Sequence, residues 1–107
     1  MLPRSTRLQE SRLISRVYQR GNRQQGAYLI VRSLPNKVQR PRVAIVVSTN
    51  VSKKATERNR TKRVLRALLS KLSLPPADMV VSVRRLPKEE YSGEFQKELT
   101  QWFRALL

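Results

Sequence analysis

Residues 55–72 limit the possible fold most strongly, because a helix is the structure that separates their apolar side chains from their charged ones. At 100° per residue, one arc collects the core-facing residues at the spacing typical of an amphipathic helix. These are Thr61, Val64, Leu65, Leu68, Leu69 and Leu72. We therefore predict a helix over Ala55–Leu72, with Ser52 as its N-cap.

The adjacent arc of this predicted helix is cationic. It holds Arg58, Asn59, Lys62, Arg63 and Arg66, which we call the cationic row. Like charges four residues apart destabilise an isolated helix by about 0.2–0.5 kcal/mol per pair, and the row contains two such pairs. A bound polyanion would relieve this repulsion. The alternative interpretation of a basic helix is an ordinary solvated surface.

The charge of the whole chain favours the polyanion. Lys and Arg number 23 against 7 Asp and Glu in 107 residues, which gives a formal net charge of +16. Such a charge destabilises a compact monomer unless a partner supplies anions. Nucleic acid is the leading candidate and an anionic membrane surface is the next. The length fits a single domain over residues 1–107, and the hydrophobic content of 39% supports a folded chain.

Composition also excludes several kinds of chemistry. Without cysteine or histidine the chain cannot form disulfides, Cys/His zinc sites or a histidine acid–base centre. The seven acidic residues form no cluster suited to holding a catalytic metal. We therefore expect no catalytic residue, bound metal, cofactor or small-molecule substrate. No signal peptide or membrane-spanning segment is evident, so the expected location is the cytoplasm.

Periodicity predicts two more helices. The first runs over Ser5–Arg20, with Ser5 or Thr6 as N-cap, Gly21 as its stop and an apolar stripe that includes Ile14 and Tyr18. The last runs over Ser92–Leu107 and places most of the aromatic mass on one core-facing stripe. That stripe consists of Tyr91, Phe95, Leu99, Trp102, Phe103 and Leu106.

Three segments are predicted as strands: Ala27–Leu34, Arg42–Ser48 and Asp78–Arg84. The latter two are nearly continuous apolar runs, as expected for strands covered on both faces. In the first, alternation places Tyr28, Ile30 and Arg32 on one face, and the arginine indicates that this face is not fully buried. Residues 21–25 are expected to be a loop, with or without a short edge strand. The class is α/β or α+β, with helices packed against one small mixed sheet.

The string Arg58-Asn59-Arg60, followed by Lys62-Arg63 and Arg66, closely resembles the signature of the bacterial ribonuclease P protein subunit. Other blocks resemble that family in the same order: Arg7-Leu8 with the first-helix residues, residues 41–48, and residues 78–81. Thr49 and Asn50 depart from the pattern, since two lysines usually follow that strand; Lys53 and Lys54 come slightly later.

The resemblance implies an αβββαβα domain with a left-handed βαβ crossover. It further implies that the signature helix, with Lys53 and Lys54, meets a catalytic RNA that carries out the chemistry with magnesium. A cleft would receive the single-stranded 5′ leader of precursor tRNA, and the matching positions are Ile14, Tyr18, Tyr28, Ile30 and Arg32. Tyr18 and Tyr28 are the residues most suited to stacking on unpaired bases.

Other classes of function explain the sequence less well. A different small basic RNA-binding protein, such as a ribosomal protein or RNA chaperone, accounts for the charge but not for the ordered blocks. A self-sufficient nuclease lacks the carboxylates or general base that phosphodiester hydrolysis needs. Membrane binding is disfavoured because the charged helix commits its apolar face to a core.

Overall fold

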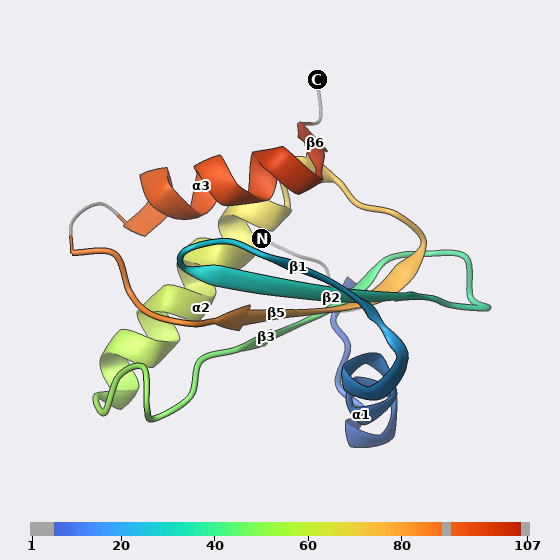
Figure 1. Ribbon diagram of the computed structural model, residues 1–107, viewed down its shortest axis with the longest axis horizontal. Coiled ribbons are helices and arrows are strands. Elements are labelled where there is room, and N and C mark those ends of the chain that lie inside the picture. The colour runs from blue at the N-terminus through green and yellow to red at the C-terminus, as the bar shows by residue number, and fades with distance from the viewer. Residues whose placement is uncertain (1–5, 89–90, 106–107) are drawn as a thin grey trace.

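The computed structural model describes residues 6–88 and 91–105 (Figure 1). Three helices surround a small mixed sheet, so the α+β class is confirmed. The elements in order are α1 (Ser11–Arg20), β1 (Asn22–Gln25), β2 (Leu29–Pro35), β3 (Arg42–Val46), α2 (Ala55–Leu69), β4 (Leu72–Ser73), β5 (Ala77–Val83), α3 (Tyr91–Trp102) and β6 (Arg104–Ala105).

The main sheet has the strand order β1-β2-β5-β3. β2 pairs antiparallel with β1 and β5, whereas β3 pairs parallel with β5. β5 is therefore central, and six of its seven residues are buried, as its apolar sequence predicts. β1 supplies the short edge strand that the sequence left open. α2 connects the parallel pair β3 and β5; the hand of this crossover stays a prediction.

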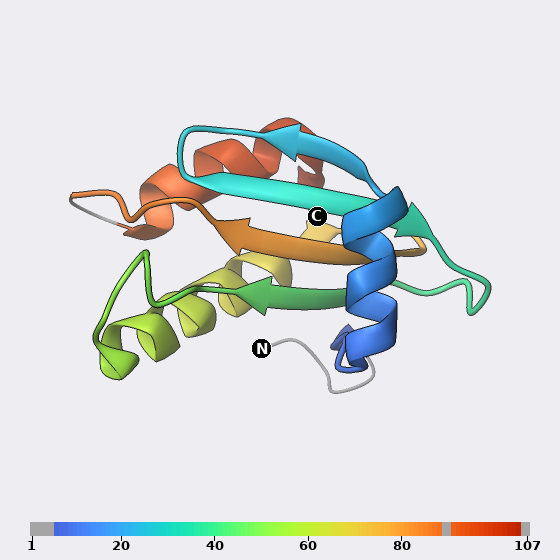
Figure 2. The same cartoon turned by 60° about the horizontal axis from the view of Figure 1, so that its bottom comes forward.

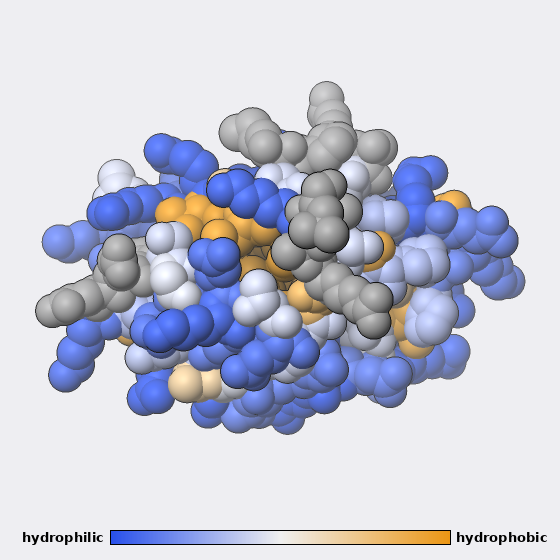
Figure 3. Space-filling view, turned by 90° about the horizontal axis from the view of Figure 1, so that it is seen from above, coloured by the Kyte–Doolittle hydropathy of each residue, from blue (hydrophilic) through white to orange (hydrophobic). Residues whose placement is uncertain are grey.

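One face of the sheet carries the larger core. α2 and α3 pack on this face, and α1 lies on the opposite one (Figure 1). The larger core joins Leu65 and Leu69 of α2 and Phe95 and Leu99 of α3 to alternate residues of the strands. Leu29 and Val31 of β2 point into it, which confirms the predicted alternation of that strand. Figure 3 shows the α3 side, where hydrophilic side chains surround a limited apolar area.

A smaller core lies beneath α1. Val17 is fully buried there against Ala44 of β3 and Val80 of β5, with Leu8 from the segment before the helix. Figure 2 shows α1 crossing the strands near one end of the sheet. The rest of that sheet face is left without a covering helix, and we call it the open sheet face.

The first helix is shorter than predicted, because it begins at Ser11 rather than Ser5. Residues 7 and 8 instead extend along β3, where the Leu8 amide donates to the Val43 carbonyl at 2.8 Å. Pairing at the sheet edge thus outweighs helix propensity in this segment. Ser5 lies outside the described residues. Gly21 ends the helix as predicted, and its amide donates to the Val17 carbonyl.

The other two helices also end earlier than predicted. α2 stops at Leu69 and α3 at Trp102, because Leu72–Ser73 and Arg104–Ala105 pair as the antiparallel strands β4 and β6. This long-range pairing leaves no signal in local periodicity. The predicted cap is wrong as well: Lys54 is the N-cap residue of α2, and the Ser52 hydroxyl accepts from its amide at 3.3 Å.

A part-buried ion pair fixes the β2–β3 connection. Arg42 of β3 donates from Nε and Nη2 to the two carboxylate oxygens of Asp78, at 2.7 and 2.9 Å. The Asn36 amide donates to the same carboxylate at 2.8 Å, so the loop is tied to β5. The hydrogen bond to Asp78 raises the pKa of Arg42 above its ordinary value, although burial acts in the opposite direction.

Candidate nucleic-acid interface

α2 presents the cationic row along one side while its other side is anchored in the core. Thr61, Leu65 and Leu69 are buried, and the Thr61 hydroxyl donates to the Glu57 carbonyl at 2.8 Å. In the row, Asn59 and Arg63 are exposed, whereas Arg58, Lys62 and Arg66 are half-buried. Arg60, next to the row, is also exposed. The row is thus held on a rigid element, with its guanidinium and ammonium groups available to phosphates.

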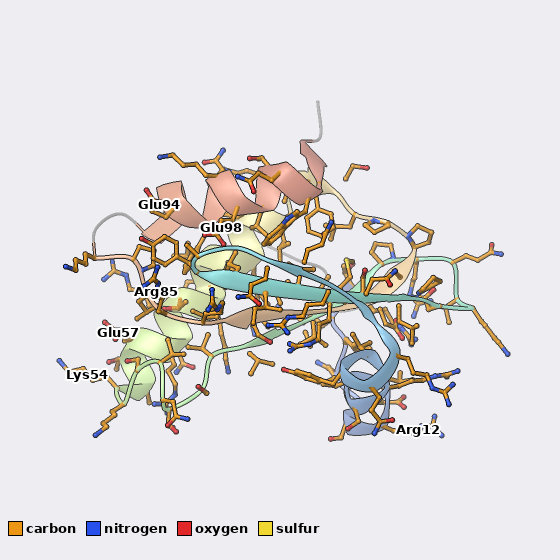
Figure 4. All side chains as sticks on the ribbon, in the orientation of Figure 1. Arg12, Lys54, Glu57, Arg85, Glu94 and Glu98 are labelled. Atoms are coloured by element: carbon orange, nitrogen blue, oxygen red, sulfur yellow. The ribbon has the colours of Figure 1, made fainter. Side chains whose placement is uncertain are left out.

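The segment just before α2 adds further positive charge. Lys53 and Lys54 are exposed just before the helix, and Figure 4 places Lys54 and Glu57 at the same end of the molecule. Arg58 donates from Nη1 to the Ser52 carbonyl at 3.0 Å, which orients its side chain. The helix dipole is positive at this end, so added cations are disfavoured there and an anion is favoured.

On the open sheet face, Tyr18 and Arg32 form a stacked pair. The Arg32 Cζ lies 4.6 Å from the centroid of the Tyr18 ring, and the Tyr18 hydroxyl lies 3.1 Å from Oγ of Ser82. Tyr18 is nevertheless 43% exposed, which is high for an aromatic residue packed on a sheet. The ring is therefore fixed in position and still accessible to a planar ligand.

The strand register places more polar groups on the same face. Ile30 lies opposite Ser82, and Gln25 of β1 lies opposite Ile30. Arg23 lies directly opposite Arg32, so two like charges face each other across β1 and β2. Such a pair is destabilising unless anions lie nearby. Arg23 is exposed, and its guanidinium donates to the Gln25 side chain.

A groove of about 220 Å³ lies at the edge of β3, between α1 and α2. Its walls include Ile14 of α1, Arg66 of α2 and the backbone segment 43–46. Arg7 also lines the groove, and its Nε atom is buried without a hydrogen-bond partner among the described residues. An unpaired buried donor is costly, so an acceptor in this groove would stabilise the protein.

Four of the five positions expected to bind the leader lie together, and the fifth lies apart. Ile14, Tyr18, Ile30 and Arg32 share the α1 side of the sheet. Tyr28 precedes β2 and packs against the larger core on the other side, where the Arg85 Cζ lies 5.3 Å from its ring centroid. The predicted alternation fails at this residue because β2 begins only at Leu29.

Sequence reasoning missed several residues that the fold brings to this surface. They are Arg7, Arg23, Gln25 and Ser82. Their position depends on strand pairing, and the sequence carries only their polarity as a signal. Across residues 6–88 and 91–105, no group of acidic or other metal-binding side chains could hold a metal ion.

In the part of the chain that the structure describes, three helices lie on a four-stranded mixed sheet with cationic surfaces on both sides, which defines a small basic α+β protein. The chain belongs to the ribonuclease P protein family, whose model matches residues 2–107 under the description Ribonuclease P. This match confirms the resemblance carried by the signature and the ordered blocks.

Relatives and solved structures agree with this assignment. Ribonuclease P protein components from Rippkaea orientalis and a Cyanothece species are 39% and 34% identical, covering 92% and 94% of the chain and 84% and 92% of the relatives. The Staphylococcus aureus RNase P protein matches the fold with a TM-score of 0.78 at 24% identity, covering 90% of both chains. The Thermotoga maritima protein gives 0.72 at 25% identity, covering 94% of this chain and all of that one.

Family membership places the chain among the protein components of an endoribonuclease complex that acts in tRNA processing. Within the described parts of the chain, no helix is long and apolar enough to cross a bilayer.

Proposed function

We propose that this protein binds the catalytic RNA of ribonuclease P through α2 and holds the 5′ leader of precursor tRNA on the open sheet face. In this way it promotes endonucleolytic removal of the leader and formation of the mature tRNA 5′ end, in the cytoplasm. The observation that carries the proposal is the Tyr18–Arg32 pair, a fixed and accessible stacking surface with Arg23 facing Arg32 from the neighbouring strand.

The open sheet face suits an unpaired strand better than a duplex. Bases can stack on the Tyr18 ring and on the plane of the Arg32 guanidinium, a contact that tolerates any base sequence. Arg23 and Arg32 can bind phosphates of the same strand, which would remove the repulsion between them. Leaders of different sequence would then bind with similar affinity.

The cationic row suits a structured RNA. Its groups lie along one helix, where arginine side chains can each make two parallel hydrogen bonds to a phosphate and the Asn59 amide can donate to the RNA backbone. Lys53 and Lys54 extend this surface past the start of α2. The groove at the edge of β3 lies between Arg66 of this surface and Ile14 of α1.

Three of the acidic side chains have structural roles that leave them unsuited to catalysis. Asp78 is bound by Arg42 and Asn36, Glu98 accepts from two backbone amides, and Glu57 accepts from the Ser52 hydroxyl. We therefore assign the chemistry to the RNA and its magnesium ions, and to the protein the binding of RNA and substrate.

The decisive experiment is multiple-turnover cleavage of a precursor tRNA by a bacterial ribonuclease P RNA at low magnesium, with and without this protein. Accurate 5′ cleavage should be stimulated by the protein, and the protein alone should cleave nothing. If it binds RNA tightly but stimulates no such RNA, it is instead a general RNA-binding protein.

A further inference from the structure

α1 carries a second set of cations that the proposed function does not use. Arg12, Arg16 and Arg20 repeat at intervals of four along this helix, and all three are exposed. We call them the arginine ladder. They line an open hollow of about 600 Å³ together with Leu13, Ser15 and Gln19. Figure 4 places Arg12 far from Lys54 and Glu57, so the ladder is separate from the start of α2.

The arginine ladder lies on the side of α1 that faces away from the open sheet face. Tyr18 points to the sheet and touches Arg32 and Ser82. Arg16 and Tyr18 are two residues apart and therefore lie about 160° apart around the helix. One helix thus presents a stacking residue on one side and a row of cations on the other.

The charge of the ladder is poorly compensated. The helix contains no acidic residue, and Glu10 approaches Arg12 only to 3.6 Å, with both side chains largely exposed. An exposed pair of this kind contributes little. Arg12 with Arg16, and Arg16 with Arg20, are like charges four residues apart, an arrangement that destabilises the helix unless an anion binds.

We propose that the arginine ladder is a second phosphate-binding surface for the part of the leader that extends beyond the open sheet face. This proposal rests on the proposed function. α1 crosses the sheet and limits the open face at one end (Figure 2), so a strand longer than that face must continue over the helix. Successive ladder residues are about 6 Å apart along the axis, a step comparable to that between neighbouring phosphates of an RNA strand.

The position of the ladder favours the leader over the catalytic RNA. α2, which is assigned to the catalytic RNA, packs on the opposite face of the sheet. The leader surface, by contrast, begins at Tyr18 on α1 itself. A strand that stacks on Tyr18 needs only to pass around one helix to reach Arg16.

The test compares affinities of the assembled enzyme for precursor tRNAs with leaders of about 4 and about 16 nucleotides, the range that one small domain can cover. The variant is R12Q/R16Q/R20Q, since glutamine preserves helix propensity. The matched control K71Q/K88Q/K97Q removes the same charge from exposed positions on α3 and on loops. Circular dichroism checks that both variants are folded.

With the long leader, the ladder variant should bind at least about tenfold more weakly, and its log–log salt slope should fall by about 2. With the short leader, the ladder variant should bind with the affinity of the unaltered protein. The control variant should bind both precursor tRNAs with that affinity. Equal losses with both leaders would overturn the proposal and assign the ladder to the catalytic RNA or the tRNA body. If the ladder variant loses affinity for neither precursor tRNA, the arginine ladder is an ordinary solvated surface and the proposal is wrong. Failure of the proposed function itself would be recognised separately, because Tyr18→Ala would then leave short-leader binding unchanged.

Discussion

Gly26 and Glu98 fit together so closely that a β-carbon on Gly26 would lie 2.1 Å from Oε1 of the glutamate. Glu98 is a buried residue of α3, and its carboxylate accepts from the amides of Tyr28 and Leu29 at 3.0 Å each. The side chain therefore takes the place of a turn hydrogen bond and ties the β1–β2 connection to α3. It occupies the space that any other residue at position 26 would need.

This fit predicts a coupled loss of stability. Gly26→Ala should lower the free energy of unfolding by about 1–3 kcal/mol, because the new methyl group displaces the carboxylate. Glu98→Ala should cost a similar amount, since it leaves two backbone donors without their acceptor. In the double variant the clash is absent, so its loss measured by urea denaturation should be clearly smaller than the sum of the two. Additive losses would contradict the contact.

The Arg42–Asp78 pair predicts a larger effect. Asp78→Ala leaves the half-buried Arg42 guanidinium without its partner and should destabilise the fold by about 3–5 kcal/mol. The pKa of Arg42 is raised on folding, so its contribution is complete below the ordinary arginine pKa and is lost only as the pH rises through the raised value. Urea unfolding midpoints measured between about pH 6 and about pH 9, well below the ordinary pKa of arginine, should therefore show no loss of the stability that Arg42 contributes. Lys97→Ala, at an exposed position on α3, is the control.

Arg63 is the most informative residue of the cationic row, because it is exposed while Arg58 is oriented by a bond to the Ser52 carbonyl. Arg63→Gln should weaken binding to the catalytic RNA and reduce the log–log salt slope by about 0.7–0.9. The unfolding midpoint should stay unchanged. Filter binding across a salt series measures both quantities. Unchanged affinity would remove this side of α2 from the interface.

The contributions of the Tyr18 ring and of its hydroxyl to binding can be measured separately. Tyr18→Ala should cost about 1–3 kcal/mol of affinity for precursor tRNA with a leader, the value of one stacked base. Tyr18→Phe keeps the ring and loses only the bond to Ser82, so its loss should be much smaller. Leaderless tRNA should be bound equally by all three proteins. A similar loss with leaderless RNA would argue against stacking on the leader.

The sequence predicted those features that depend on local pattern. The amphipathic spacing of α2 predicted which of its sides faces the core and which carries the cationic row. The apolar runs predicted β3 and β5. The signature string led to the correct family. In each case the physical cause lies within a window of a few residues, which a single sequence contains.

The features that were missed depend on contacts between distant segments. Leu72 continues the helical pattern of α2 but pairs instead with the chain after α3. Arg23 faces Arg32 only through the register of β1 and β2, and Tyr28 lies before β2, where its amide donates to the Glu98 carboxylate of α3. Local propensity is too weak to compete with such pairing.

The sheet separates the two surfaces that we propose bind RNA. α1 and α2 lie on its opposite faces, in a molecule whose shortest extent is 24 Å. At low ionic strength, two polyanions on opposite faces would repel each other through water, but here the space between them is filled by a chain with a net charge of +16. If both RNAs bind as proposed, the protein also acts as an electrostatic shield, and its effect on substrate affinity should be greatest at low ionic strength.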